Sequence, residues 1–78
     1  MMKKINPTSV YFFLLENKAE LLHVSKTQIS SGGMNMHRTV HRLADGKIFV
    51  DEQTHNTRLQ RVGTVAQFSA EYPYIEIQ

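Results

Sequence analysis

The dipeptide Asp45-Gly46 limits the fold of this chain more than any other pair of residues, because it stands between two apolar stretches. Asp-Gly in this setting favours a two-residue hairpin turn, since glycine adopts a positive φ without steric cost. Counting outward from the turn places Leu43 opposite Ile48 and Arg42 opposite Phe49. The inward face of this hairpin then carries His41, Leu43, Ile48 and Val50, and the outward face carries Arg38, Val40, Arg42, Lys47, Phe49 and Asp51.

The same stretch has a helical alternative, in which Asn35 caps a helix over residues 36–44. Met36, Val40 and Leu43 keep helical spacing, and Gly46 is then the left-handed residue beyond the helix end. With residues 47–53 and 58–63 as a two-stranded wing, the arrangement resembles a winged helix. We favour the hairpin, because a glycine pair at 32–33 and the preceding serines oppose the additional helix that a winged helix needs at 26–31.

Composition supports strands over helices along the whole chain. The sequence holds six Val, five Ile and six Thr but only four Ala. Turn-like residues recur about every dozen positions, which is typical of a meander of short strands. We therefore predict a mainly β fold, a small antiparallel meander or barrel of five to six strands, with one short helix at about 34–44 as a variant and an α+β winged helix as the alternative.

The length of 78 residues predicts a single domain spanning 1–78. A core of this size is marginal, and the absence of cysteine excludes disulfides and thiolate metal sites, so self-association is the remaining way to enlarge it. The apolar run at 10–15 is too short to cross a membrane, and no signal-peptide cleavage site follows it. We expect a cytoplasmic protein.

Residues 9–24 predict a first hairpin that turns at Asn17-Lys18. Both faces of this hairpin are apolar, so both need cover. We expect a second copy of the chain to cover one face, as a homodimer whose interface includes Tyr11, Phe13, Leu15 and Leu22. A helix that begins after Ser9 is the alternative for this segment.

The remaining segments are assigned by pattern. Residues 25–35 are polar and contain the glycine pair, which predicts a loop. Residues 47–53 and 58–68 predict two strands, and residues 74–77 predict a short strand that closes the sheet, with Ile75 and Ile77 pointing inward.

Catalytic and metal-binding patterns find little support in the sequence. His37 and His41 are spaced to share a metal on a helix, but a third ligand is not evident. The chain has no cysteine and no G-x-S-x-G nucleophile turn, and its seven acidic residues are scattered. We therefore expect no enzyme activity, no metal and no cofactor.

A basic cluster is the clearest functional signal. Arginines beside aromatic rings are typical of nucleic-acid binders, and a basic face also suits an acidic protein partner. We expect a non-enzymatic accessory or regulatory protein that binds another protein, of a kind common on phages and mobile elements. A nucleic-acid-binding regulator is the alternative. The candidate binding residues are His37, Arg38, His41, Arg42, Lys47, Phe49, Arg58 and Arg61.

Overall fold

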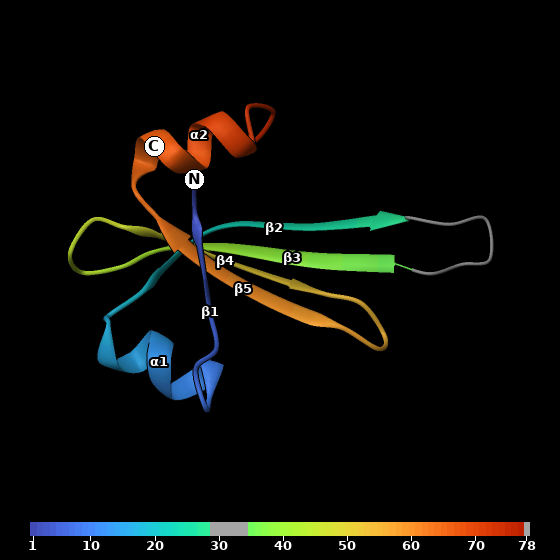
Figure 1. Ribbon diagram of the computed structural model, residues 1–78, viewed down its shortest axis with the longest axis horizontal. Coiled ribbons are helices and arrows are strands. Elements are labelled where there is room, and N and C mark those ends of the chain that lie inside the picture. Colours follow the sequence, from blue (N-terminus) through green and yellow to red (C-terminus); the bar gives the residue numbers. More distant parts are fainter. Residues whose placement is uncertain (29–34, 78) are drawn as a thin grey trace.

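The computed structural model of the protein describes residues 1–28 and 35–77. Five antiparallel strands form one open sheet, in the order β1-β5-β4-β3-β2, and two short helices cover its opposite faces (Figure 1). The prediction of a mainly β, antiparallel fold is therefore confirmed. The elements are β1 (Lys3–Ile5), α1 (Val10–Glu16), β2 (Glu20–Gln28), β3 (Asn35–Arg42), β4 (Ile48–Gln53), β5 (Arg58–Gly63) and α2 (Val65–Glu71).

The central stretch is a strand, so the helix expected as a variant at 34–44 is wrong, and so is the winged helix. β3 lies between β2 and β4 and pairs with both of them. Its buried residues, Arg38 and Val40, alternate with more exposed ones, as the two-residue period of a strand requires. Hydrogen bonds to both neighbouring strands outweigh the helical spacing of Met36, Val40 and Leu43. The predicted loop at 25–35 is also corrected at its ends: β2 continues to Gln28 and β3 begins at Asn35, while the glycine pair lies outside the described residues.

The turn at Asp45-Gly46 is present, but it is longer than predicted. Leu43 donates its N–H to the carbonyl of Lys47 at 2.8 Å, and Gly46, with φ of 89°, closes the loop between them. The resulting register pairs Arg42 with Ile48, not with Phe49. Because side chains alternate across a strand, this shift of one residue moves every predicted cross-strand partner to the other face.

The first predicted hairpin is wrong, because its first half is the helix α1. The Ser9 hydroxyl accepts a hydrogen bond from the Phe12 N–H at 3.3 Å and so caps the helix. Asn17 ends the helix, with its side-chain amide donating to the Phe13 carbonyl at 2.8 Å, and Lys18 then takes a positive φ of 49°. The alternative that began a helix after Ser9 is therefore correct for residues 10–16 only, because residues 20–24 belong to the strand β2.

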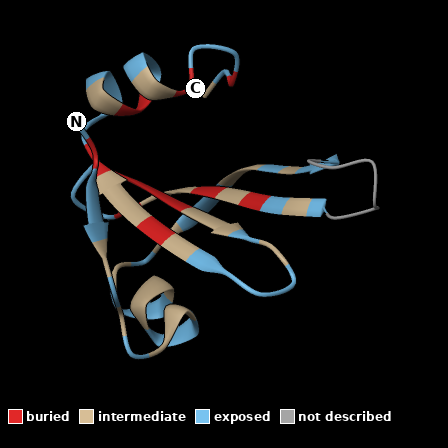
Figure 2. Cartoon of the chain, turned by 45° about the vertical axis from the view of Figure 1, so that its right-hand side comes forward, coloured by how far each residue is buried: buried red, intermediate tan, exposed pale blue. Residues whose placement is uncertain are grey.

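The main core lies between the sheet and α2. It consists of buried residues from both ends of the chain and from β3 and β4: Met2, Val40, Ile48, Val50, Phe68, Tyr72 and Ile75. Buried positions of the chain are red in Figure 2. Leu22 and Ile77 pack against its margin. The N-terminal residues and α2 thus share one face of the sheet.

The predicted strand over 58–68 ends at Gly63, where α2 takes over. A Cβ at Gly63 would lie 2.6 Å from the side-chain oxygen of Gln67 and 2.9 Å from Cγ of Met2, so the close approach of these elements requires glycine. Thr64 and Gln67 form a capping box that starts α2. The strand predicted at 74–77 is also wrong, because this segment is irregular, although Ile75 is buried as expected.

Neither helix in the described residues is long and apolar enough to cross a membrane.

Candidate functional site

The arginines of the chain are engaged within the protein. All four form ion pairs with carboxylates: Arg38 and Arg61 with Glu52, Arg42 with Glu20, Arg58 with Asp51, and Arg61 also with Glu71. The basic cluster that the sequence indicates is therefore largely neutralised by internal partners, and a phosphate would have to compete with those carboxylates.

Two of these arginines build a network beneath α2. The guanidinium groups of Arg38 and Arg61 lie 5.1 and 5.3 Å from the centre of the Tyr72 ring. Glu52 accepts hydrogen bonds from both arginines, and also accepts one from the Tyr72 hydroxyl at 3.1 Å. Arg38 is only 9% exposed, so the predicted surface role for this residue is wrong. The network joins β3, β4 and β5 to α2.

The other predicted binding residues do not share one surface. His37, His41, Phe49 and Arg58 point toward the α1 face of the sheet, whereas Arg38, Arg42 and Arg61 point toward the α2 face, and Lys47 lies in the loop between β3 and β4. Phe49 is completely buried, which contradicts its predicted role in stacking against a ligand. Its ring packs against Phe13 of α1, with 4.9 Å between the ring centres. The alternation of side chains along β3 separates the two histidines from Arg38 and Arg42, and the shift in register places Phe49 on the face of the histidines.

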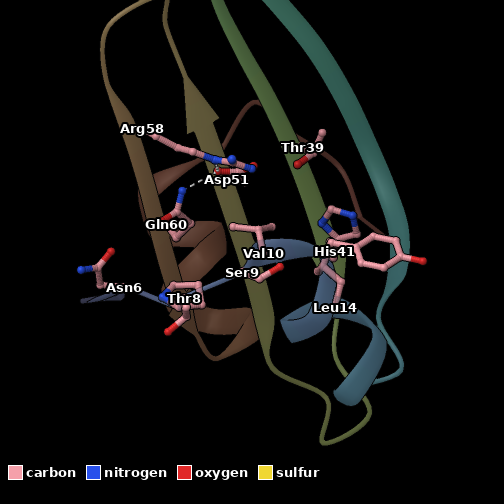
Figure 3. Close-up of a pocket in the computed structure, with 12 residues that line it drawn as sticks. Asn6, Thr8, Ser9, Val10, Leu14, Thr39, His41, Asp51, Arg58 and Gln60 are labelled. Atoms are coloured by element: carbon pink, nitrogen blue, oxygen red, sulfur yellow. Dashed lines mark hydrogen bonds and ion pairs between the residues drawn. The ribbon is translucent and has the colours of Figure 1, made fainter.

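An open cleft of about 790 Å³ lies between α1 and the sheet (Figure 3). One wall is the stretch from Asn6 to Tyr11 together with Leu14, and the other is the α1 face of β3, β4 and β5. The sheet wall is polar, with the side chains Thr39, His41, Asp51, Arg58 and Gln60.

Three hydrogen bonds hold Asp51 in place on the sheet wall of this cleft. Arg58 donates two hydrogen bonds to its carboxylate, at 3.2 and 2.9 Å, and Gln60 donates a third at 2.9 Å. Burial alone raises the pKa of Asp51, but these hydrogen bonds and the nearby positive charge outweigh it and hold the pKa below its ordinary value. A carboxylate engaged in this way is a poor general base.

His41 lines the cleft between the polar side chains of the sheet and the apolar side chains of α1. Its ring centre is 6.1 Å from that of Phe49, and its Nδ1 is buried without a hydrogen-bond partner in the described part of the chain. Burial lowers the pKa of His41, against the opposing charge of Asp51. The imidazole is therefore neutral near pH 7. No group of three His, Asp or Glu side chains able to hold a metal ion occurs in residues 1–28 and 35–77.

Exposed apolar side chains of α1 and β2 border the cleft. All seven residues of α1 are exposed or half-buried, and Tyr11, Phe12 and Leu15 are 68%, 61% and 56% exposed. Tyr11 lines the cleft together with Thr39 and His41.

Thr39 and His41 have Val24 and Leu21 of β2 as their cross-strand partners. Val24 and Leu21 are also more than half exposed, and they lie on the same face of the sheet as Thr39 and His41. We call this set the α1–β2 surface: Tyr11, Phe12, Leu15, Leu21 and Val24.

The residues predicted for a dimer interface divide into two groups. Tyr11 and Leu15 belong to the α1–β2 surface, but Phe13 packs on Phe49 and Leu22 packs against the main core. The reason is that this segment is a helix followed by a strand, not a hairpin with two apolar faces. Sequence reasoning missed Phe12, Leu21 and Val24. Phe12 and Leu15 are three residues apart, a spacing that places two side chains on one face of a helix, and this spacing could have indicated Phe12.

No known protein family matches the chain, and no curated protein or solved structure is significantly similar to it.

Proposed function

We propose that the protein acts by binding, not by catalysis, and that the α1–β2 surface docks a protein partner. One observation carries this proposal: a helix of seven residues turns Tyr11, Phe12 and Leu15 toward solvent while only one side of it contacts the sheet. Aromatic and large aliphatic side chains grouped in this way are typical of protein interfaces.

The surroundings of α1 support a docking role. Phe12 also lines a second hollow, of about 360 Å³, together with Pro7 and Phe13, on the other side of the helix from the cleft. Hollows on both sides of an exposed apolar ridge offer places for side chains of a partner to anchor. The internal pairing of all four arginines favours a protein partner over a nucleic acid.

The experiment places a photo-crosslinking amino acid at position 12 in cells of the source organism. We expect it to capture a protein, and we expect Leu15→Ser to lower the affinity for that purified protein by roughly tenfold or more, since exposed anchors of this kind dominate interface energies. The matched control is Val65, which is exposed on α2 on the opposite face; crosslinker there should capture nothing, and Val65→Ser should leave the affinity unchanged.

Three results would speak against the proposal. Equal capture from positions 12 and 65 would remove the assignment to this surface. An affinity unchanged by Leu15→Ser would do the same. Binding to duplex or single-stranded nucleic acid that weakens steeply with salt would favour the alternative regulator. Light scattering of the purified chain shows whether the partner is a second copy, as the expectation of a homodimer requires.

A further inference from the structure

The partner's conformation follows from the outer edge of β2, which borders the α1–β2 surface. β2 is nine residues long and stands at one end of the sheet order, and none of the described strands pairs with its outer side. An edge of this kind presents backbone groups that another strand can pair with. The other end of the sheet, β1, has only three residues, two of them lysine.

The ladder shows which residues of β2 direct their backbone outward. Leu43 donates to the Lys47 carbonyl, so this pair is hydrogen-bonded, and alternation makes His41–Phe49 and Thr39–Asp51 the next such pairs. Arg38 and Val40 therefore direct their backbone groups toward β2, where their partners are Ser25 and His23.

The intervening residues of β2, Val24 and Lys26, then direct their N–H and C=O groups away from the sheet. Their side chains lie on the α1 face, since their cross-strand partners are Thr39 and His37. A strand added here would bring alternate side chains over the same face as α1.

The side chains along this edge indicate which kind of strand it can bind. Residues 21–44 contain no Asp or Glu, and they include Lys26 and three histidines. An added strand thus meets an apolar position at Val24 and a positive one at Lys26, two residues apart. An acidic residue in the added strand is complementary to the second position.

A second copy of the chain does not match this edge. Antiparallel pairing of two β2 strands about Ser25 sets Val24 against Lys26, and pairing about Lys26 sets the two lysines against each other. Pairing about Val24 brings in the irregularity between Leu21 and His23. Both a lysine and a bulge are devices that keep edge strands from pairing with themselves.

We propose that the outer edge of β2 binds an extended segment of a different protein, by strand addition, and that this segment carries an apolar and an acidic residue two positions apart. The proposal rests on the proposed function and names the kind of partner that the α1–β2 surface accepts.

The test uses a phage-displayed library of random 12-residue peptides, selected on the immobilised full-length chain. We expect the enriched peptides to share the apolar-x-acidic pattern. On binding, the backbone amides of Val24 and Lys26 should become protected from hydrogen exchange, whereas the amide of Ser25, already used in the sheet, should change little. Lys26→Glu should weaken binding by about tenfold or more, and selection on this variant should replace the acidic residue by Lys or Arg.

Two further variants separate the edge from general effects. Lys47→Glu makes the same charge change in the exposed loop between β3 and β4, and it should leave both affinity and the selected pattern unchanged. Lys26→Pro removes an N–H that the sheet does not use, so it should block strand addition. Lys26→Glu, which leaves the backbone intact, keeps the test decisive if the proline variant fails to fold.

Several outcomes overturn the proposal. These are peptides that bind Lys26→Glu as well as the original chain, protection confined to residues outside β2, the absence of any enriched peptide, or self-association through β2. Peptides that lose affinity on Leu15→Ser but not on Lys26→Glu would leave the proposed function standing and refute the strand addition. Peptides affected by neither variant would refute both.

Discussion

His41 lies where the polar cleft meets the apolar side of α1, and its protonation is coupled to folding. The groups around it are Phe49 and Asp51 on β4, Leu21 across the strand pair, and Tyr11 and Leu14 of α1. Most of these are apolar, so burial outweighs the nearby carboxylate and lowers the pKa of the imidazole.

This lowered pKa predicts a pH-dependent stability. Between the pKa of folded His41 and the ordinary value of about 6.5, the unfolded chain binds more protons than the folded one. The contribution of neutral His41 to the free energy of unfolding is therefore complete above pH 6.5, and this contribution is lost as the pH falls below 6.5. We expect the difference in free energy of unfolding between pH 7.5 and pH 5.5, measured with urea, to shrink in His41→Gln.

The control for this prediction is His55→Gln, at an exposed position in the turn between β4 and β5. It should retain the pH dependence of the original chain. Asp51 also has a lowered pKa, but its contribution is lost only at more acidic pH, as the carboxylate takes up a proton, so the two effects occur in separate pH ranges. Parallel pH profiles for His41→Gln and the original chain would contradict the assignment.

At the scale of elements, the network around Glu52 fixes α2 and the N-terminus to the sheet. Arg61 bridges Glu52 of β4 and Glu71 of α2, and Glu71 also accepts a hydrogen bond from the backbone N–H of Met2 at 2.7 Å. Side chains of Arg38 and Glu52 are each only 11% exposed, so both charges depend on each other for compensation.

Removal of Glu52 should destabilise the protein strongly. Glu52→Ala leaves two guanidinium groups and the Tyr72 hydroxyl without their shared acceptor, and loss of one partner of a buried ion pair typically costs about 3 kcal/mol or more. Urea unfolding at pH 7 measures this loss. The exposed Glu76→Ala serves as control and should change the free energy of unfolding by less than about 0.5 kcal/mol. A loss of similar size in both variants would mean that the network does not stabilise the fold.

At the scale of the whole molecule, β4 contributes side chains to two packed layers, one beneath α2 and one against α1. Ile48 and Val50 face the core beneath α2, and the residue between them, Phe49, faces α1. The α2 layer holds most of the buried side chains, whereas α1 has no buried residue and packs the half-buried ring of Phe13 on Phe49. The two helices should therefore differ in local stability.

Phe13→Ala should release α1 without unfolding the α2 layer. Loss of this half-buried ring should lower the stability of the α1 layer by about 2 kcal/mol, toward the lower end of the range for large-to-small substitutions. Hydrogen exchange should show faster exchange for the amides of α1, while amides around Phe68 remain protected. Phe12→Ala, at the neighbouring exposed position, is the matched control and should leave both helices as they are. Equal loss of protection in α1 and α2 would contradict the separation of the layers.

Local sequence signals determined part of this structure on their own. The excess of Val, Ile and Thr predicted antiparallel strands, and Asp45-Gly46 marked the turn between β3 and β4, because only glycine takes the positive φ of Gly46 easily. Ser9 was a visible helix cap, although the apolar residues that follow it fit a hairpin equally well.

Tertiary structure decided the rest, and above all which face each side chain occupies. The turn is longer than the Asp-Gly pair implies, and the resulting shift of one residue in register places Arg38 on the core face with Ile48 and Val50. The same shift places Phe49 on the opposite face, where it is buried against α1. The helix α1 prevails over a hairpin through its cap and through contact with Phe49, a residue distant in sequence. Pairing of the arginines likewise depends on carboxylates from other elements, so sequence alone could not distinguish a basic surface from an internal ionic network.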